Sequence, residues 1–138
     1  MRKLCLDIGS VRIGIAQSDS LGIIATACST LVRSKSSMQD AKKIAEMIKE
    51  KQVDTVVVGL PLKLDGSEGD SVKMIRAFVQ ELSKHTNATI VYEDERFSTV
   101  SAQRILIESN VRREKRKDIV DSVAATIILQ SYLDRIKK

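Results

Sequence analysis

The sequence predicts an α/β fold in which helices cover a mixed five-stranded sheet, with three antiparallel strands and two parallel ones. Two features lead to this prediction. The chain opens with three apolar runs joined by short turns, which suits antiparallel hairpins. Two later apolar runs each follow a helical stretch, which suits parallel strands reached through helices. The 138 residues, 43% of them hydrophobic and 30% charged, predict a single globular domain over residues 1–138.

Five segments are rich in apolar and β-branched residues over the length of a strand, and we predict that they form the sheet. They cover residues 3–8, 13–18, 23–32, 55–58 and 89–92. Turns over residues 9–11 and 19–22, each with a glycine, are short enough to join the first three strands as hairpins. The run at 55–58 is entirely β-branched, which favours a central strand.

Four helices are predicted between and after these strands, most of them from apolar residues at helical spacing. They cover residues 38–51, 70–84, 98–108 and 118–136. Ser37 with Asp40 three residues later is a capping signal for the first helix, and Ser98 can cap the third. Residues 62–69 predict a loop because they contain two glycines, and the basic, polar segment 110–117 is expected to be a charged loop.

Composition and cysteine usage exclude several classes of function. No apolar run approaches the length of a membrane span, and Met1 to Leu4 run directly into the first strand, which predicts no signal peptide. Cys5 and Cys28 lie in apolar runs without metal-type spacing, which predicts free thiols in a reducing, cytoplasmic setting. Because His85 is the only histidine, histidine-based triads and zinc sites are poorly supported. The net charge of +5 is compatible with a polyanionic partner.

Acidic residues stand at the ends of two predicted strands. Asp7 ends the first strand, and Asp94 and Glu95 follow the fifth. If these strands run parallel, the carboxylates meet at the carboxyl edge of the sheet, where α/β proteins bind ligands. A buried aspartate is costly unless it is paired, hydrogen-bonded or bound to a metal. Two other interpretations remain open: Asp7 can cap the turn at residues 9–10, and residues 92–95 can form a solvated acidic turn.

The last predicted helix supplies a third acidic candidate. Asp121 falls at the border of its apolar side, one turn before Ala124 and Ala125, whose small side chains would let the helix approach the sheet closely. The helix dipole also favours acidic residues in a first turn, which explains Asp118 well and Asp121 less well. A basic cluster precedes the helix and can bind a phosphate backbone, or it can be an exposed charged surface. It comprises Arg112, Arg113, Lys115, Arg116 and Lys117.

The chemistry of these residues favours hydrolysis of a phosphodiester. Two or three carboxylates without a histidine suit Mg²⁺ or Mn²⁺ rather than zinc. Such ions activate water and stabilise the leaving oxygen. Arg12, close to Asp7 in the sequence, is a candidate for holding a phosphate.

Four separated motifs resemble those of the YqgF/RuvX family, Holliday-junction-resolvase-like proteins with a ribonuclease H-like fold. The motifs are residues 7–16 with 18–19, residues 58–62 with 65–68, residues 94–99, and residues 117–121 with 124–125 and 127–129. One such motif would be weak, but four in this order span nearly the whole chain and are strongly specific.

This resemblance implies a nuclease that trims the end of pre-16S ribosomal RNA, with Asp7, Glu95 and Asp121 as the catalytic acids that hold Mg²⁺ or Mn²⁺. Ribonuclease H-like nucleases commonly use four carboxylates. The strand end where resolvases carry another glutamate reads Gly59-Leu60-Pro61 here, which puts Holliday-junction cleavage in doubt. Asp118 is the candidate for a fourth acid.

We therefore predict a cytoplasmic, metal-dependent nuclease that acts on structured RNA. Ribosomal precursor particles are a further candidate partner. We expect the protein to be a monomer or a homodimer and to make no contact with membranes. Substrate phosphates are assigned to Arg12, Arg96, Arg112, Arg113, Arg116 and Lys117. Three alternatives stay open: a Holliday-junction-type resolvase of branched DNA, a non-catalytic RNA-binding factor in ribosome assembly, and a phosphotransfer or ATPase module. The last of these needs two such domains, and 138 residues provide one.

Overall fold

The structure, a computed structural model, describes residues 2–97 and 113–137, with side chains for all of these except residues 113–122. The helix predicted over residues 98–108 lies outside the described part of the chain. No helix among the described residues is long and apolar enough to cross a membrane.

Five strands form one mixed sheet in the order β3-β2-β1-β4-β5. They are β1 (Arg2–Ile8), β2 (Arg12–Ser18), β3 (Ala25–Val32), β4 (Val53–Leu60) and β5 (Thr89–Asp94). The first three strands pair antiparallel as successive hairpins, while β4 joins β1 in parallel and β5 joins β4 in parallel. The predicted fold class is therefore confirmed, including the division into three antiparallel strands and two parallel ones.

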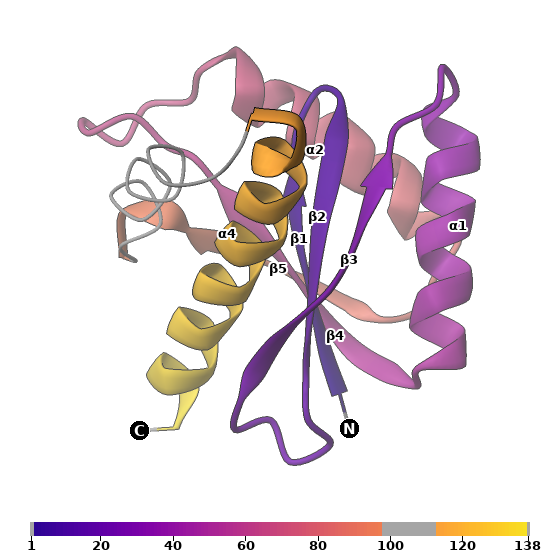
Figure 1. Ribbon diagram of the computed structural model, residues 1–138, viewed down its shortest axis with the longest axis vertical. Coiled ribbons are helices and arrows are strands. Elements are labelled where there is room, and N and C mark those ends of the chain that lie inside the picture. Colours follow the sequence, from indigo (N-terminus) through magenta and orange to yellow (C-terminus); the bar gives the residue numbers. More distant parts are fainter. Residues whose placement is uncertain (1, 98–112, 138) are drawn as a thin grey trace.

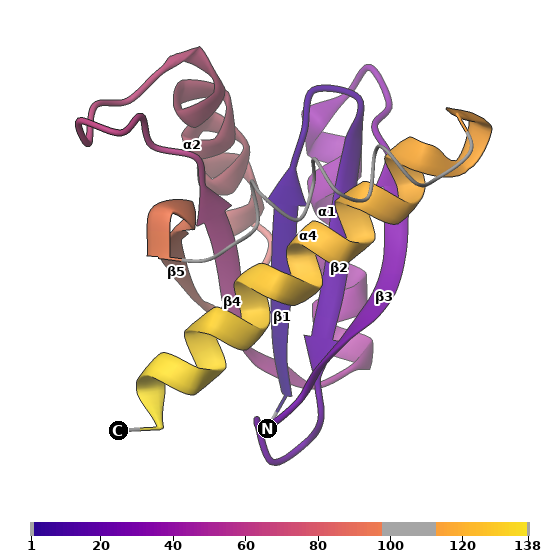
Figure 2. The same cartoon turned by 60° about the vertical axis from the view of Figure 1, so that its left-hand side comes forward.

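Helices cover both faces of this sheet (Figure 1). Two of them, α1 (Ser37–Glu50) and α2 (Asp70–Ser83), pack against each other and cover one face. The last helix, α4 (Arg113–Ile136), runs diagonally across the strands on the other face (Figure 2). A short 3-10 turn, η1 (Glu95–Phe97), follows β5 directly.

The two faces of the sheet have different cores because side chains alternate along each strand. On the face covered by α1 and α2, the buried residues are mostly large, such as Leu4 and Leu6 of β1. Under α4 they are often small, such as Ala16 of β2 and Ala124 of α4, so this helix lies close to the sheet. Asp7 follows Leu6 and therefore belongs to the α4 face.

Two predicted boundaries were wrong for identifiable reasons. The third strand begins at Ala25 rather than residue 23 because Asp19 Oδ1 accepts hydrogen bonds from the Ile23 and Ile24 amides, at 2.7 and 3.0 Å, which holds them in the turn. The cap of α1 is Ser36, whose Oγ accepts from the Gln39 amide at 3.2 Å, rather than Ser37. The buried Asp40 carboxylate takes no part in this cap, because it accepts hydrogen bonds from the Ser34 amide and Ser34 Oγ instead.

The expectation of a charged loop over residues 110–117 was wrong for the part that the structure describes. Residues 113–117 form the start of α4. Arginine, lysine and glutamate are good helix formers, and no glycine or proline interrupts this stretch, so high charge did not prevent a helix here.

Candidate active site

Asp7 lies near the end of β1, between two glycines of the neighbouring strands. It pairs with Gly14 of β2, and because Leu6 pairs with Val58 in parallel, the next residue of β4 beside it is Gly59. All three positions face α4. Neither glycine carries a side chain, which leaves room beside the carboxylate, and Asp7 is only 8% exposed.

Glu95 occupies the space above Gly59. It is the first residue of η1 and only 7% exposed. A Cβ placed on Gly59 would lie 3.0 Å from Glu95 Oε2 and 2.8 Å from Ile128 Cδ1 of α4. The carboxylate of Glu95 and the apolar side of α4 therefore meet over Gly59, next to the strand that carries Asp7. A side chain at position 59 would displace one of them.

The environment of Cys5 shows how much negative charge gathers on this face. Burial raises the pKa of the Cys5 thiol well above its ordinary value, and the carboxylates of Asp7, Glu95 and Glu93 raise it further. The thiol therefore stays neutral and is part of the apolar layer below the carboxylates. A thiol in this state is a poor nucleophile, so Cys5 has a packing role.

The helical start of α4 changes the interpretation of Asp121. Because the helix already includes Arg113, both Asp118 and Asp121 lie beyond its first turn. The helix dipole acts within the first turn, so it does not explain either aspartate. The Asp121 side chain is outside the described side chains, but Ala124 and Ala125, one turn later, are buried against the sheet.

Glu93 of β5 ties α4 to the sheet. It is fully buried on the α4 face of β5, and its carboxylate pairs with Arg135 and accepts a 3.3 Å hydrogen bond from Ser131 Oγ. Arg135 also lies over the ring of Phe97, 5.4 Å from its centroid. Because a buried carboxylate is expensive without such partners, this cluster ties the C-terminal half of α4 to β5 and η1.

A second contact fixes the same helix to the opposite edge of the sheet. Gln130 Oε1 accepts from the Ala25 amide at 2.9 Å, and Gln130 Nε2 donates to Ile23 O at 3.0 Å. Neither Gln130 nor the cluster at Glu93 was found from the sequence, because each joins segments far apart in the chain. The only sequence signal for these contacts was a polar residue at an inward-facing position of the last helix.

Asp94 and Arg96 hold the loop that follows β4. Arg96 Nη2 and Nε donate to Asp94 Oδ2 at 2.7 and 3.0 Å, and Arg96 Nη1 donates to Leu64 O at 3.3 Å. The hydrogen bonds from Arg96 hold the pKa of Asp94 below its usual range. The ion pair between Asp94 and Arg96 is therefore intact at neutral pH and is lost only as the pH falls through that lowered value. The sequence predicted that Arg96 holds a substrate phosphate. It did not indicate that Arg96 also contacts this loop.

The other predicted phosphate contacts are only partly described. Arg12 begins β2 and is partly buried at the same end of the sheet as Asp7. Arg113, Arg116 and Lys117 belong to α4, with side chains outside the described set, and Arg112 lies outside the described residues.

The donor set at this edge suits a hard divalent cation. Asp7 supplies a carboxylate from β1, on the strand next to Gly59, and Glu95 supplies one from η1, over Gly59. Among the described side chains, no group of three histidine, cysteine, aspartate or glutamate residues could hold a metal ion. Asp121, the third predicted ligand, is outside that set.

Comparisons with known proteins lead to one family. A family model described as "RuvX: Holliday junction resolvase" matches residues 1–135. A Fusobacterium nucleatum protein named "Putative pre-16S rRNA nuclease" is 49% identical over 99% of both chains. A Halalkalibacterium halodurans protein of the same name is 46% identical, over 98% of this chain and 97% of its own.

One solved structure relates the sheet to a known nuclease fold. Thermus thermophilus RuvC, in complex with a Holliday junction substrate, superposes with a TM-score of 0.60 over 99% of this chain and 96% of its own. At 11% sequence identity this likeness concerns the fold alone, and it confirms the predicted ribonuclease H-like architecture.

Proposed function

The chain belongs to the RuvX family, and from this membership we propose that it is a metal-dependent nuclease that processes the precursor of 16S ribosomal RNA in the cytoplasm. The observation that supports the proposal is that Asp7 lies on the strand next to Gly59 and Glu95 lies over Gly59. Two acidic side chains, one from β1 and one from η1 directly after β5, are both almost fully buried at the carboxyl edge of the sheet. Such an arrangement is costly without a cation.

In this proposal Asp7, Glu95 and Asp121 hold one or two Mg²⁺ or Mn²⁺ ions. A bound ion of this kind lowers the pKa of a water molecule and stabilises the charge on the leaving oxygen. The two described carboxylates are preorganised, because β1 and η1 fix their backbones and burial limits their rotamers. Arg12, Lys117 and the basic start of α4 neutralise the phosphates of the incoming chain.

One experiment tests the proposed function against an alternative substrate and an alternative role. The description of the matching family refers to Holliday junctions, which favours branched DNA as the alternative substrate, and a non-catalytic RNA-binding factor is the alternative role. Labelled precursor RNA and four-way DNA junctions are incubated with the protein in Mn²⁺ or in EDTA. We expect specific cleavage of the RNA in Mn²⁺ alone. Cleavage of the junction instead would identify a resolvase, and binding without any cleavage would identify an assembly factor.

Neutralising the basic start of α4 is expected to weaken RNA binding and to flatten its salt dependence. Each lost contact to a phosphate of single-stranded RNA lowers the slope of log K against log salt by about 0.7. We would replace Arg113 and Arg116 of this helix, together with Arg112, which precedes it in the sequence, by glutamine and measure affinity across a salt series. The rate at saturating RNA should change less than the affinity.

The matched control removes the same amount of charge elsewhere. Lys42, Lys43 and Lys49 are exposed on α1, on the opposite face of the sheet from α4. Replacing them by glutamine should leave the slope close to that of the unmodified protein. If the two triple variants have equal slopes, the basic start of α4 is an ordinary solvated surface.

A further inference from the structure

We propose that Arg33 is a positioning residue for the nuclease reaction: from the far side of the sheet it holds the β1–β2 turn, residues 9–11, and thereby fixes the end of β1 that carries Asp7. The inference rests on the nuclease function proposed above. It concerns a residue outside the metal set, immediately after β3, that none of the four sequence motifs includes.

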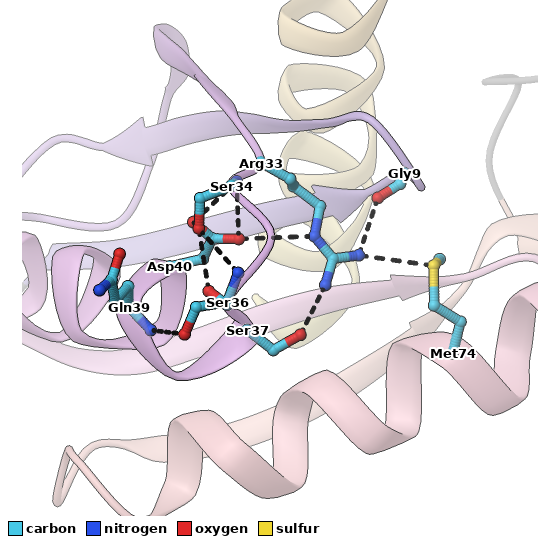
Figure 3. Close-up of polar contacts among 8 residues, drawn as sticks. All are labelled: Gly9, Arg33, Ser34, Ser36, Ser37, Gln39, Asp40 and Met74. Carbon is cyan, nitrogen blue, oxygen red and sulfur yellow. Dashed lines mark hydrogen bonds and ion pairs between the residues drawn. The ribbon is translucent and has the colours of Figure 1, made fainter.

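Arg33 contacts the turn at two points. Its backbone amide donates to Val11 O at 2.8 Å, and its Nη1 donates to Gly9 O at 3.2 Å (Figure 3). The turn itself is tight, because the Gly9 amide donates to Arg12 O at 2.8 Å and a Cβ on Gly9 would lie 2.8 Å from that oxygen. Gly9 follows Asp7 by two residues, so a shift of this carbonyl moves the end of β1.

The guanidinium of Arg33 is held by both helices of the opposite face. Its Nη2 donates to Ser37 Oγ of α1 at 3.1 Å, and its Nη1 lies 3.5 Å from Met74 Sδ of α2. Its Cζ lies 5.0 Å from the centroid of the Phe78 ring. With a side chain only 12% exposed, Arg33 has little freedom to leave this position.

Asp40 supplies the charge that balances Arg33 in this buried place. Its carboxylate is fully buried, with Oδ2 3.8 Å from Arg33 Nε. The same carboxylate accepts hydrogen bonds from the Ser34 amide at 3.1 and 3.2 Å and from Ser34 Oγ at 2.9 Å (Figure 3). Continuous contacts therefore run from α1 through Asp40 and Arg33 to the Gly9 carbonyl.

The shape of arginine matters for this role. A guanidinium is a rigid planar fork that donates in several fixed directions, and here its donors face the turn, α1 and α2 at once. An ammonium is a single point on a flexible stem and reaches one or two of these partners. Arg33→Lys thus keeps the charge beside Asp40 but loosens the hold on Gly9.

The test compares Arg33→Lys with Arg76→Lys. Arg76 of α2 is a matched control, since it also pairs with a carboxylate, 2.8 Å from Glu68 Oε2, and lies over a ring, 4.8 Å from the Tyr92 centroid. Outer contacts of metal sites typically change activity or affinity about 10–100-fold. In Arg33→Lys we expect kcat to fall and the Mn²⁺ dissociation constant to rise by that order, with KM for RNA within about twofold of the unmodified value. Arg76→Lys should change none of them.

A readout that needs no catalysis separates this inference from the nuclease proposal. Exchange of the Gly9 amide proton, measured by NMR, should accelerate in Arg33→Lys and stay unchanged in Arg76→Lys. If the unmodified protein cleaves nothing but this difference appears along with weaker Mn²⁺ binding, the nuclease proposal fails, while Arg33 is still shown to position the turn and the metal-binding end of β1. If the Gly9 amide and the Mn²⁺ affinity are as in Arg76→Lys, Arg33 is only a packing residue.

A milder variant keeps the test decisive if Arg33→Lys does not fold. Ser37→Ala removes one partner of the guanidinium at the exposed start of α1 and leaves the core unchanged. It should accelerate Gly9 exchange and weaken Mn²⁺ binding in the same direction, by a few-fold. Unchanged exchange and affinity in Ser37→Ala, together with an unfolded Arg33→Lys, would overturn the positioning role.

Discussion

Asp7→Asn is expected to lower kcat at least about a hundredfold while the protein stays folded. Residues that only orient metal ligands already contribute about 10–100-fold, and a direct ligand should contribute no less. The substitution nearly keeps the shape of the side chain but removes an anionic oxygen from the proposed site. Because Asp7 and Glu95 carry like charges, are both almost fully buried and both act on the Cys5 thiol, removing one charge should leave the thermal midpoint the same or raise it.

The experiment measures cleavage of precursor RNA, Mn²⁺ affinity and thermal unfolding on the same samples. Asp54→Asn is the matched control, because Asp54 lies at the opposite end of β4 and pairs with Lys3 at 3.1 Å. That variant should cleave normally. Full activity in Asp7→Asn, or undiminished cleavage by the unmodified protein in EDTA, would refute the carboxylate–metal mechanism.

Much of the fold could be predicted because its signals are local. The first three strands are apolar runs joined by turns too short for anything but hairpins, and the fourth is a β-branched run. Boundaries failed where a polar side chain only a few residues away binds the backbone amides at the start of an element. Asp19 holds Ile23 and Ile24 out of β3, and Ser36 rather than Ser37 caps α1.

The placement of Asp7 and Glu95 at one edge of the sheet could also be predicted, because the carboxyl ends of the parallel strands β1, β4 and β5 share that edge. What the sequence could not indicate is why Gly59 is a glycine. The residue has no turn to form, since β4 continues through it to Leu60. Its bare backbone makes room for Glu95 and Ile128, which come from later segments, and only the folded chain brings them together.

The acidic run Glu93-Asp94-Glu95 gives the sharpest test of this assignment, since three neighbouring residues have three different tasks. Glu95→Gln should remove a metal ligand, so cleavage should fall at least about a hundredfold with no loss of stability. Glu93→Gln should weaken the hydrogen bonds to Ser131 and Arg135, which would lower the free energy of unfolding by about 1.5–3 kcal/mol. The folded fraction should still cleave.

Asp94→Asn completes the series as the internal control, because the Asp94 side chain is 13% exposed, whereas that of Glu93 is fully buried. The partner of Asp94, Arg96, contacts the loop after β4. We expect a change in stability below about 1 kcal/mol, as for exposed ion pairs, and a turnover close to that of the unmodified protein. Chemical unfolding and cleavage at saturating RNA and Mn²⁺ separate the three outcomes. Alternation along β5 turns Glu93 toward α4 and Asp94 away from it. Glu93 is paired with Arg135, whereas Glu95, the first residue of η1, lies over Gly59. If Glu93→Gln folds well but loses as much turnover as Glu95→Gln, Glu93 would also be a metal ligand. Arg135 would then have to release the Glu93 carboxylate when the ion binds.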